Sequence, residues 1–253
     1  MRKLLIIWMI CLLLVGCAPT PPTEPVETKP AVVPIQTQPV TEPTMLPTEA
    51  PTIPPTEVPD MPPEDDELVR VADFIPGIRQ NLRYATKENF TGQQIYDFAD
   101  AYLRYGTVKK LQVACEELAQ QNLGILIWDG FRPVAAQEKL WEICPDPAYV
   151  SHPVTGSRSH CRGSAVDLTL IDLRTGQLLE MPTDFDDFSK LADRDYSDCP
   201  KAAAENARLL EEVMKKHGFK PYSAEWWHYS DTEDYPVEED FHPVQTVFDG
   251  GVG

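Results

Sequence analysis

Residues 18–67 consist largely of proline, threonine, glutamate and valine, and this stretch limits how much of the chain can form a packed domain. Its apolar residues follow neither a helical nor an alternating pattern. Such a segment cannot bury enough apolar surface to offset the entropy that it would lose on ordering. We therefore expect a disordered linker, extended by its prolines, that serves as a tether, a spacer or a glycosylated stalk.

The N-terminus has the pattern of a signal peptide. A basic pair, Arg2-Lys3, precedes the apolar run 4–15, which is shorter than the roughly 20 residues that a membrane span needs. The run ends in Leu14-Val15-Gly16-Cys17, which resembles the lipobox of bacterial lipoproteins. We expect a lipoprotein signal peptide over 1–17, lipidation of Cys17, and a protein outside the cytoplasm that is attached to the bacterial membrane only through this lipid. A cleaved signal without a lipid, or an uncleaved anchor, remains an alternative.

The formal net charge of −18 argues against nucleic acid as a partner, since phosphate binding needs clustered lysine and arginine. It also argues against a polybasic membrane patch. Four cysteines remain beyond the signal region, and in an exported domain they could form one or two disulfides. Small buried apolar residues are the other interpretation. The pairing cannot be deduced for these four positions: Cys115, Cys144, Cys161 and Cys199.

The remaining residues, 68–253, are expected to form a single domain. Apolar residues at helical spacing predict helices over 108–121, 134–143 and 200–217. Apolar runs bounded by turn residues predict strands over 68–72, 124–128, 165–171 and 219–229, with a hairpin turn at 174–176. This mixture predicts an α+β fold with a central, largely antiparallel sheet and packed helices.

Two separated clusters contain the residue types of a catalytic zinc site. Such a site has three protein ligands and an open position for water, and His160, Asp167 and His228 would supply the ligands. Glu225, three residues before the last ligand, would handle the proton of the water. The first cluster could instead contain an aspartate that is hydrogen-bonded to backbone amides and a histidine on the surface. The second could be an aromatic strand that happens to include a charged residue.

A third cluster is Trp128-Asp129-Gly130-Phe131-Arg132-Pro133. Arg132 follows a predicted buried strand and precedes a rigid proline, so it could point into a cleft. There its guanidinium could stabilise an oxyanion or hold a substrate carboxylate. The alternative is a surface arginine paired with Asp129 or a nearby glutamate.

These motifs and their order resemble those of the D-alanyl-D-alanine dipeptidases of the VanX type. These enzymes belong to the zinc peptidase family M15, which also contains D,D- and L,D-carboxypeptidases. The likeness runs from about residue 68 to 244. The segments that carry it are Tyr84-Ala85-Thr86, Asn89-Phe90-Thr91-Gly92, Trp128 to Pro133, His160 to Leu170 and Glu225-Trp226-Trp227-His228-Tyr229.

The resemblance implies one zinc ion on the ligands named above, Glu225 as general base and acid, and Arg132 stabilising the intermediate. It also implies that Asp186 pairs with the free ammonium of a small D,D-dipeptide substrate. Tyr84 would line the same pocket, or else be a core aromatic.

Two positions depart from the family pattern. Arg158 stands where the family commonly has a substrate-facing serine, two residues before His160, which leaves recognition of the substrate carboxylate less defined. Cys161 stands where serine is usual, and we expect it to pack in the core or form a disulfide.

The sequence leaves alternative functions open. The nearest is a D,D- or L,D-carboxypeptidase that acts on peptidoglycan stem peptides. A non-catalytic lipoprotein that binds wall peptides is a third interpretation. Whether the role is glycopeptide resistance, scavenging or wall recycling, and the oligomeric state, do not follow from the sequence.

Overall fold

The computed structural model describes residues 61–245. The predicted signal peptide, its Cys17 and the predicted linker up to residue 60 lie outside the described residues. Among the helices of the described part, none has the length and apolar character needed to cross a membrane.

Helices and strands are mixed along the chain, as the predicted α+β fold requires. The α-helices are α1 (Val71–Phe74), α2 (Tyr105–Ala119), α3 (Val134–Ile143) and α4 (Lys201–Lys216). The strands are β1 (Leu68–Arg70), β2 (Arg79–Gln80), β3 (Tyr102–Arg104), β4 (Leu123–Asp129), β5 (Ala165–Asp172), β6 (Phe219–Pro221) and β7 (His228–Asp231). Short 3₁₀ turns occur at η1 (Arg83–Ala85), η2 (His160–Arg162) and η3 (Lys190–Ala192).

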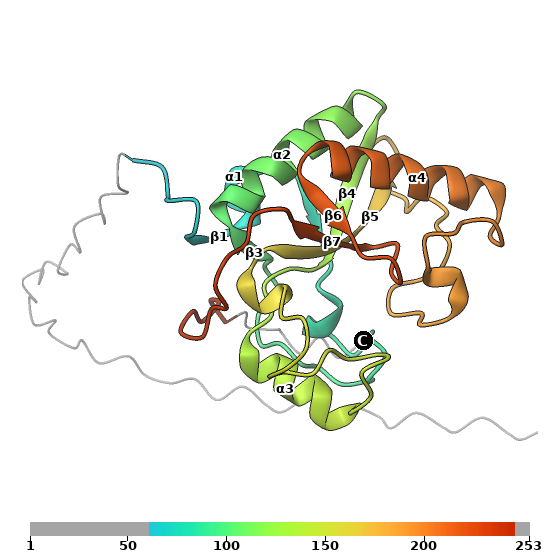
Figure 1. Ribbon diagram of the computed structural model, residues 1–253. Helices are drawn as coiled ribbons and strands as arrows, with labels where there is room; N and C mark the ends of the chain where they lie inside the picture. The colour runs from blue at the N-terminus through green and yellow to red at the C-terminus, as the bar shows by residue number, and fades with distance from the viewer. Residues whose placement is uncertain (1–60, 246–253) are drawn as a thin grey trace, which may run out of the picture. The chain divides into compact units, whose positions relative to one another are not determined.

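The central sheet has five strands in the order β2-β4-β5-β7-β6, and only β2 and β4 pair in parallel. The prediction of a largely antiparallel sheet is therefore confirmed. Helices α2 and α4 lie together over one face of the sheet, and α3 lies on its other side (Figure 1). Strands β1 and β3 form a separate antiparallel pair.

The long periodic segments fold as their patterns predict. Helix α3 has the predicted bounds, and α4 has the predicted bounds except that Pro200 and His217 cap its ends. Buried residues of α4 recur at helical spacing, at Ala203, Ala207, Leu210 and Met214. The apolar face of α4 covers one face of the sheet.

Several short features differ from the prediction. The predicted strand 68–72 ends at Arg70, and its last two residues begin α1. The expected strand region 219–229 forms two antiparallel strands, β6 and β7, joined by a turn. Helix α2 begins at Tyr105, before the predicted start at Val108. Strands β2 and β3 were not predicted, because strands of two and three residues are too short to have a recognisable periodic pattern.

The four cysteines of the described part are free thiols. Cys161 is fully buried, so packing rather than a disulfide accounts for it. Burial also raises the pKa of the Cys115 thiol to about 12. Of the two interpretations of these cysteines, the structure supports small apolar residues within the packed domain.

A buried arginine at the end of β3 joins three separate segments. Arg104 donates hydrogen bonds to the carbonyls of Asp66, Arg162 and Pro236 and forms an ion pair with Glu238 at 3.3 Å. Arg162 ends η2, the turn that begins with His160. One side chain therefore holds the segment around Asp66, η2 and the C-terminal segment around Pro236.

Candidate functional site

Polar residues lie side by side on three neighbouring strands, β4, β5 and β7. The strand register pairs Asp129 with Asp167, and Asp167 with His228. Paired residues on adjacent strands point to the same face of a sheet. Val166 and Leu168 lie in the apolar core, so Asp167 between them points to the opposite face. That face is the side of the sheet on which α3 lies (Figure 1).

Three potential metal ligands converge at this point. His160 Nε2 lies 3.3 Å from Asp167 Oδ2 and 3.1 Å from His228 Nδ1. His228 Nδ1 lies 2.9 Å from Asp167 Oδ1. Within residues 61–245, these side chains form the one group of three or more metal-ligating residues. A tetrahedral zinc ion, bound at about 2.1 Å, separates its ligand atoms by about 3.4 Å, so the donor set fits such an ion.

The second ring nitrogen of each histidine has a partner that orients the ring. His160 Nδ1 lies 2.8 Å from the Gly130 carbonyl, to which its N–H can donate, and this leaves Nε2 as the ligand atom. His228 Nε2 lies 3.1 Å from Ser230 Oγ, and this leaves Nδ1 as the ligand atom. Neither partner was predicted from the sequence. Ser230 could have been found as the residue two positions along the same strand face.

The charges around the ligands favour a bound cation. Burial raises the pKa of Asp167, but the charge of His160 and hydrogen bonds from both histidines outweigh burial and hold that pKa well below its usual range. Burial lowers the pKa of His160, while the carboxylates of Asp167 and Asp129 raise it above its ordinary value. The site therefore concentrates negative charge that a cation can neutralise.

Arg132 is paired with Asp129, which was the alternative to a role in the cleft. The pair does not lie on the surface, however, but is buried, and Arg132 lines the inside of a cavity. The Asp129 side chain is fully buried, and its Oδ2 accepts from Arg132 Nη2 at 2.7 Å. Arg132 Nη1 donates to Gln137 Oε1 at 2.8 Å, and the guanidinium lies 5.0 Å from the centre of the Tyr84 ring. These contacts hold the cation at the wall of the cavity.

Asp186 and Tyr84 form a second polar pair. The Tyr84 hydroxyl donates to Asp186 Oδ2 at 2.9 Å. Burial and the charge of Asp167 raise the pKa of Asp186 well above its usual range. Asp186 also has a φ of 57°, in the left-handed region that asparagine and aspartate tolerate better than most residues. The backbone is therefore shaped to hold this side chain at the site.

Glu225 lies on the turn between β6 and β7. Its Oε2 is 3.9 Å from His228 Nδ1, so the carboxylate is beside the ligand group without belonging to it. Burial raises the pKa of Glu225, and this effect outweighs the charge of His228, which lowers it. The pKa of this carboxyl group is therefore shifted toward neutral pH, the direction that suits a group that accepts and then donates a proton.

These side chains share a cavity of about 430 Å³, between the ends of β5 and β7 and the segment around α3. Arg158 lines it together with Ser157 and Ser159. Among the described residues, no hydrogen-bond or ion-pair partner reaches the Arg158 guanidinium. The cavity therefore contains an unpaired cation that could receive an anionic group.

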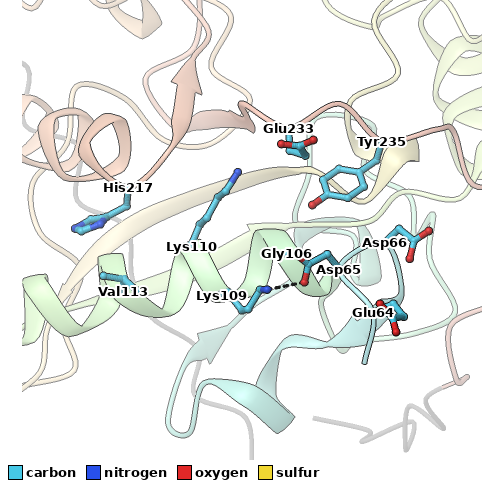
Figure 2. A pocket seen from close by; sticks show the side chains of 10 residues that line it. All are labelled: Glu64, Asp65, Asp66, Gly106, Lys109, Lys110, Val113, His217, Glu233 and Tyr235. Atoms are coloured by element: carbon cyan, nitrogen blue, oxygen red, sulfur yellow. Dashed lines mark hydrogen bonds and ion pairs between the residues drawn. The ribbon is translucent and has the colours of Figure 1, made fainter. Parts of the chain in front are cut away.

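A larger groove of about 730 Å³ lies elsewhere, along the start of α2, and Figure 2 shows the residues that line it. Its basic side chains already have acidic partners: Lys109 pairs with Asp65, Lys110 with Asp231, and His217 with Glu117. Because the groove lacks the converging ligands described above, we assign the candidate site to the smaller cavity.

The structure brings the predicted site residues of the folded part into this one cavity. They are Tyr84, Arg132, Arg158, His160, Asp167, Asp186, Glu225 and His228. The predicted lipidation site, Cys17, lies outside the described residues. The supporting role of Gln137 was not foreseen, because an amide on a helix shows no distinctive sequence pattern.

Comparisons with known proteins agree with this arrangement. The family model Peptidase M15, described as D-ala-D-ala dipeptidase, matches residues 64–247. The D-alanyl-D-alanine dipeptidase of Escherichia coli (strain K12) is 36% identical over 176 residues, which cover 69% of this chain and 90% of the relative. Similar matches occur with the D-alanyl-D-alanine dipeptidases of Enterococcus faecium (33% over 193 residues; 68% of this chain and 96% of the relative) and Streptomyces coelicolor (34% over 202 residues; 71% and 95%).

We predict that Ser230→Ala weakens zinc binding by roughly 10- to 100-fold, because the mutant loses the partner that orients the His228 ring. Competition with a chromogenic chelator measures this affinity. Ser223→Ala is the control, since Ser223 is exposed and lies outside the cavity lining. Equal zinc affinities in the two variants would show that Ser230 does not orient the ligand.

Proposed function

The chain belongs to the peptidase M15 family of D-Ala-D-Ala dipeptidases, and on this premise we propose that it hydrolyses D-alanyl-D-alanine, or a close D,D-dipeptide, with the help of a bound zinc ion. The observation that carries the proposal is the convergence of His160, Asp167 and His228 beside the carboxylate of Glu225, in one cavity. A hydrolytic metal site needs this combination of three ligands and a nearby proton acceptor.

A zinc ion held by these ligands would polarise the scissile carbonyl and acidify the attacking water. Glu225 takes a proton from that water and later passes it to the departing amine of D-alanine. The raised pKa of Glu225 supports both steps, because a group that must accept and then donate a proton works best when its pKa lies near the operating pH.

Arg132 has the role of stabilising negative charge on the carbonyl oxygen during attack. Its guanidinium is already oriented by Asp129 and Gln137, so little rearrangement is needed when that charge develops. Removing Asp129 or Gln137 would leave the cation less well directed, although neither residue would touch the reacting atoms.

The two charged ends of a free dipeptide have candidate partners in the cavity. Asp186, supported by the Tyr84 hydroxyl, is the partner for the ammonium group. Arg158, whose guanidinium has no partner in the described part of the chain, is the partner for the carboxylate. A longer stem peptide carries no free ammonium at the residue before the scissile bond, so pairing with Asp186 favours a dipeptide.

We predict that Glu225→Gln retains zinc but lowers kcat by about 100- to 10,000-fold, the range expected when an acid–base group is lost. The measurements are metal content and release of D-alanine from D-Ala-D-Ala. Glu233→Gln is the control, because this exposed carboxylate lies outside the cavity lining. Turnover close to that of the unaltered protein would reject Glu225 as the proton carrier.

The effect of Asp186→Asn distinguishes a dipeptidase from a carboxypeptidase that acts on stem peptides. Asparagine tolerates the left-handed backbone at this position, but it has no negative charge with which to form an ion pair with an ammonium group. We expect kcat/KM for D-Ala-D-Ala to fall by roughly 10- to 100-fold, in line with the loss of a charged hydrogen bond. The exposed neighbour provides the control variant Asp187→Asn.

The same assay is made with a pentapeptide stem ending in D-Ala-D-Ala, with and without a chelator. We expect the unaltered protein to cleave the free dipeptide in a chelator-sensitive reaction and to leave the stem intact. Efficient cleavage of the stem would assign the protein to the carboxypeptidases. Cleavage of neither substrate would favour a non-catalytic wall-peptide-binding protein.

We also propose that the protein is exported and lipid-anchored, on the evidence of the N-terminal basic pair, apolar run and Cys17 alone. Outside the cytoplasm, its substrates would be dipeptides released from the wall or wall peptides themselves. We predict that Cys17→Ser abolishes incorporation of a labelled fatty acid and releases the protein from the membrane fraction. Cys11→Ser is the control, and equal labelling of both variants would contradict lipidation at Cys17.

A further inference from the structure

A buried arginine behind the cavity contacts the turn that carries Glu225 and His228. Arg194 lies two residues after η3, and its side chain is only 9% exposed. It does not line the cavity, so a bound dipeptide would not touch it. One edge of its guanidinium instead contacts the main chain of the turn.

The guanidinium bonds three carbonyl groups of this turn. Nε donates to the Tyr222 carbonyl at 2.7 Å. Nη2 donates to the carbonyls of Glu225 and His228, at 2.9 and 3.0 Å. A lysine ammonium could not make this set of contacts, because it is a compact charge without the planar, spread donors of a guanidinium.

The other edge of the guanidinium is held in place by α4 and β7. Nη1 lies within 3.2 Å of Glu211 Oε2 and 3.1 Å of the hydroxyls of Tyr196 and Tyr229. The Tyr229 ring lies 4.6 Å from the guanidinium carbon. Since these contacts fix the plane of the group, the donors that face the turn have a fixed direction.

At Glu225 the hydrogen bonds within the turn are longer than the one from Arg194, and its N–H donates to the Tyr222 carbonyl at 3.3 Å. His228 is also held by the pairing of β7 with β5. The His228 N–H donates to the Glu225 carbonyl at a long 3.3 Å, whereas Arg194 approaches the same carbonyl at 2.9 Å. Trp226 and Trp227, between the two functional residues, are buried and anchor the middle of the turn. Arg194 therefore makes the shorter hydrogen bond to the Glu225 carbonyl, and it holds the His228 carbonyl in addition to the strand pairing.

We propose that Arg194 is a positioning residue that holds the main chain of Glu225 and His228, so that the proton-accepting carboxylate keeps its 3.9 Å separation from the ligand nitrogen. This inference rests on the proposed function. A misplacement of about 1 Å can lower turnover by roughly 100-fold. The effect falls on kcat and on retention of zinc, rather than on KM, because Arg194 does not line the substrate cavity.

The test compares three variants of the full-length protein. Arg194→Lys removes the three-way contact and keeps the charge. Glu211→Gln removes the ion pair on the other edge and leaves the carbonyl contacts intact. Arg208→Lys alters a neighbouring arginine that lies 5.5 Å from the Tyr196 ring and does not reach the turn. For each variant, kcat and KM on D-Ala-D-Ala, the rate of zinc release to a chelator, and the thermal unfolding midpoint are measured.

We expect Arg194→Lys to lower kcat by about 10- to 100-fold with KM changed less than about twofold, and to release zinc faster. Glu211→Gln should lower the unfolding midpoint while kcat stays within about threefold, and Arg208→Lys should resemble the unaltered protein. The proposal is overturned if Arg194→Lys and Glu211→Gln lose kcat equally at equal loss of thermal stability, since that pattern indicates a purely structural role.

If Arg194→Lys does not fold, Arg194→Gln is measured in its place, because a planar amide can still bond one carbonyl. Unaltered kcat and zinc release in that variant would equally overturn the proposal. An unaltered protein that binds zinc but does not cleave the dipeptide would reject the proposed function, and the zinc-release rates would then still decide the role of Arg194.

Discussion

The pairing of β5 with β7 is the interaction on which the rest of the site depends. It sets Asp167 opposite His228 and leaves Ser230 on the same face, two residues further along the strand. Because side chains alternate between the faces of a sheet, a slip of one residue would turn this polar set into the apolar core. The helices over the other face oppose such a slip, since Leu168 and Tyr229 are fully buried.

The end of β4, the strand next to β5, orients further charged groups of the site. Asp129 is fully buried and directs Arg132 toward the cavity, while the Gly130 carbonyl beside it orients His160. One short segment at the end of β4 thus orients both a residue of the ligand group and the cation that lines the cavity. A buried charge is tolerated only when such partners are present, so the arrangement fixes each side chain before any substrate arrives.

Sequence patterns predicted the helices with periodic apolar residues and the site residues with distinctive chemistry. The apolar spacing of α3 and α4 was sufficient to place both helices, and a histidine, an aspartate and a second histidine in the resemblance motifs marked the ligand group. The partners that orient these groups were not predictable. Gly130 acts through its carbonyl and Arg194 through main-chain contacts 28 to 34 residues away, and neither interaction depends on a recognisable local pattern.

Arg104 gives the domain a mechanical connection between the segment around Asp66 and the candidate site. A pulling force applied to the chain before Asp66 would load the Arg104 guanidinium, which is bonded to the carbonyls of Asp66 and Arg162 at once. Arg162 is two residues from His160, but the same guanidinium is also held by Pro236 and Glu238. Tension would therefore be shared with the C-terminal segment and would not pass to η2 and His160 alone.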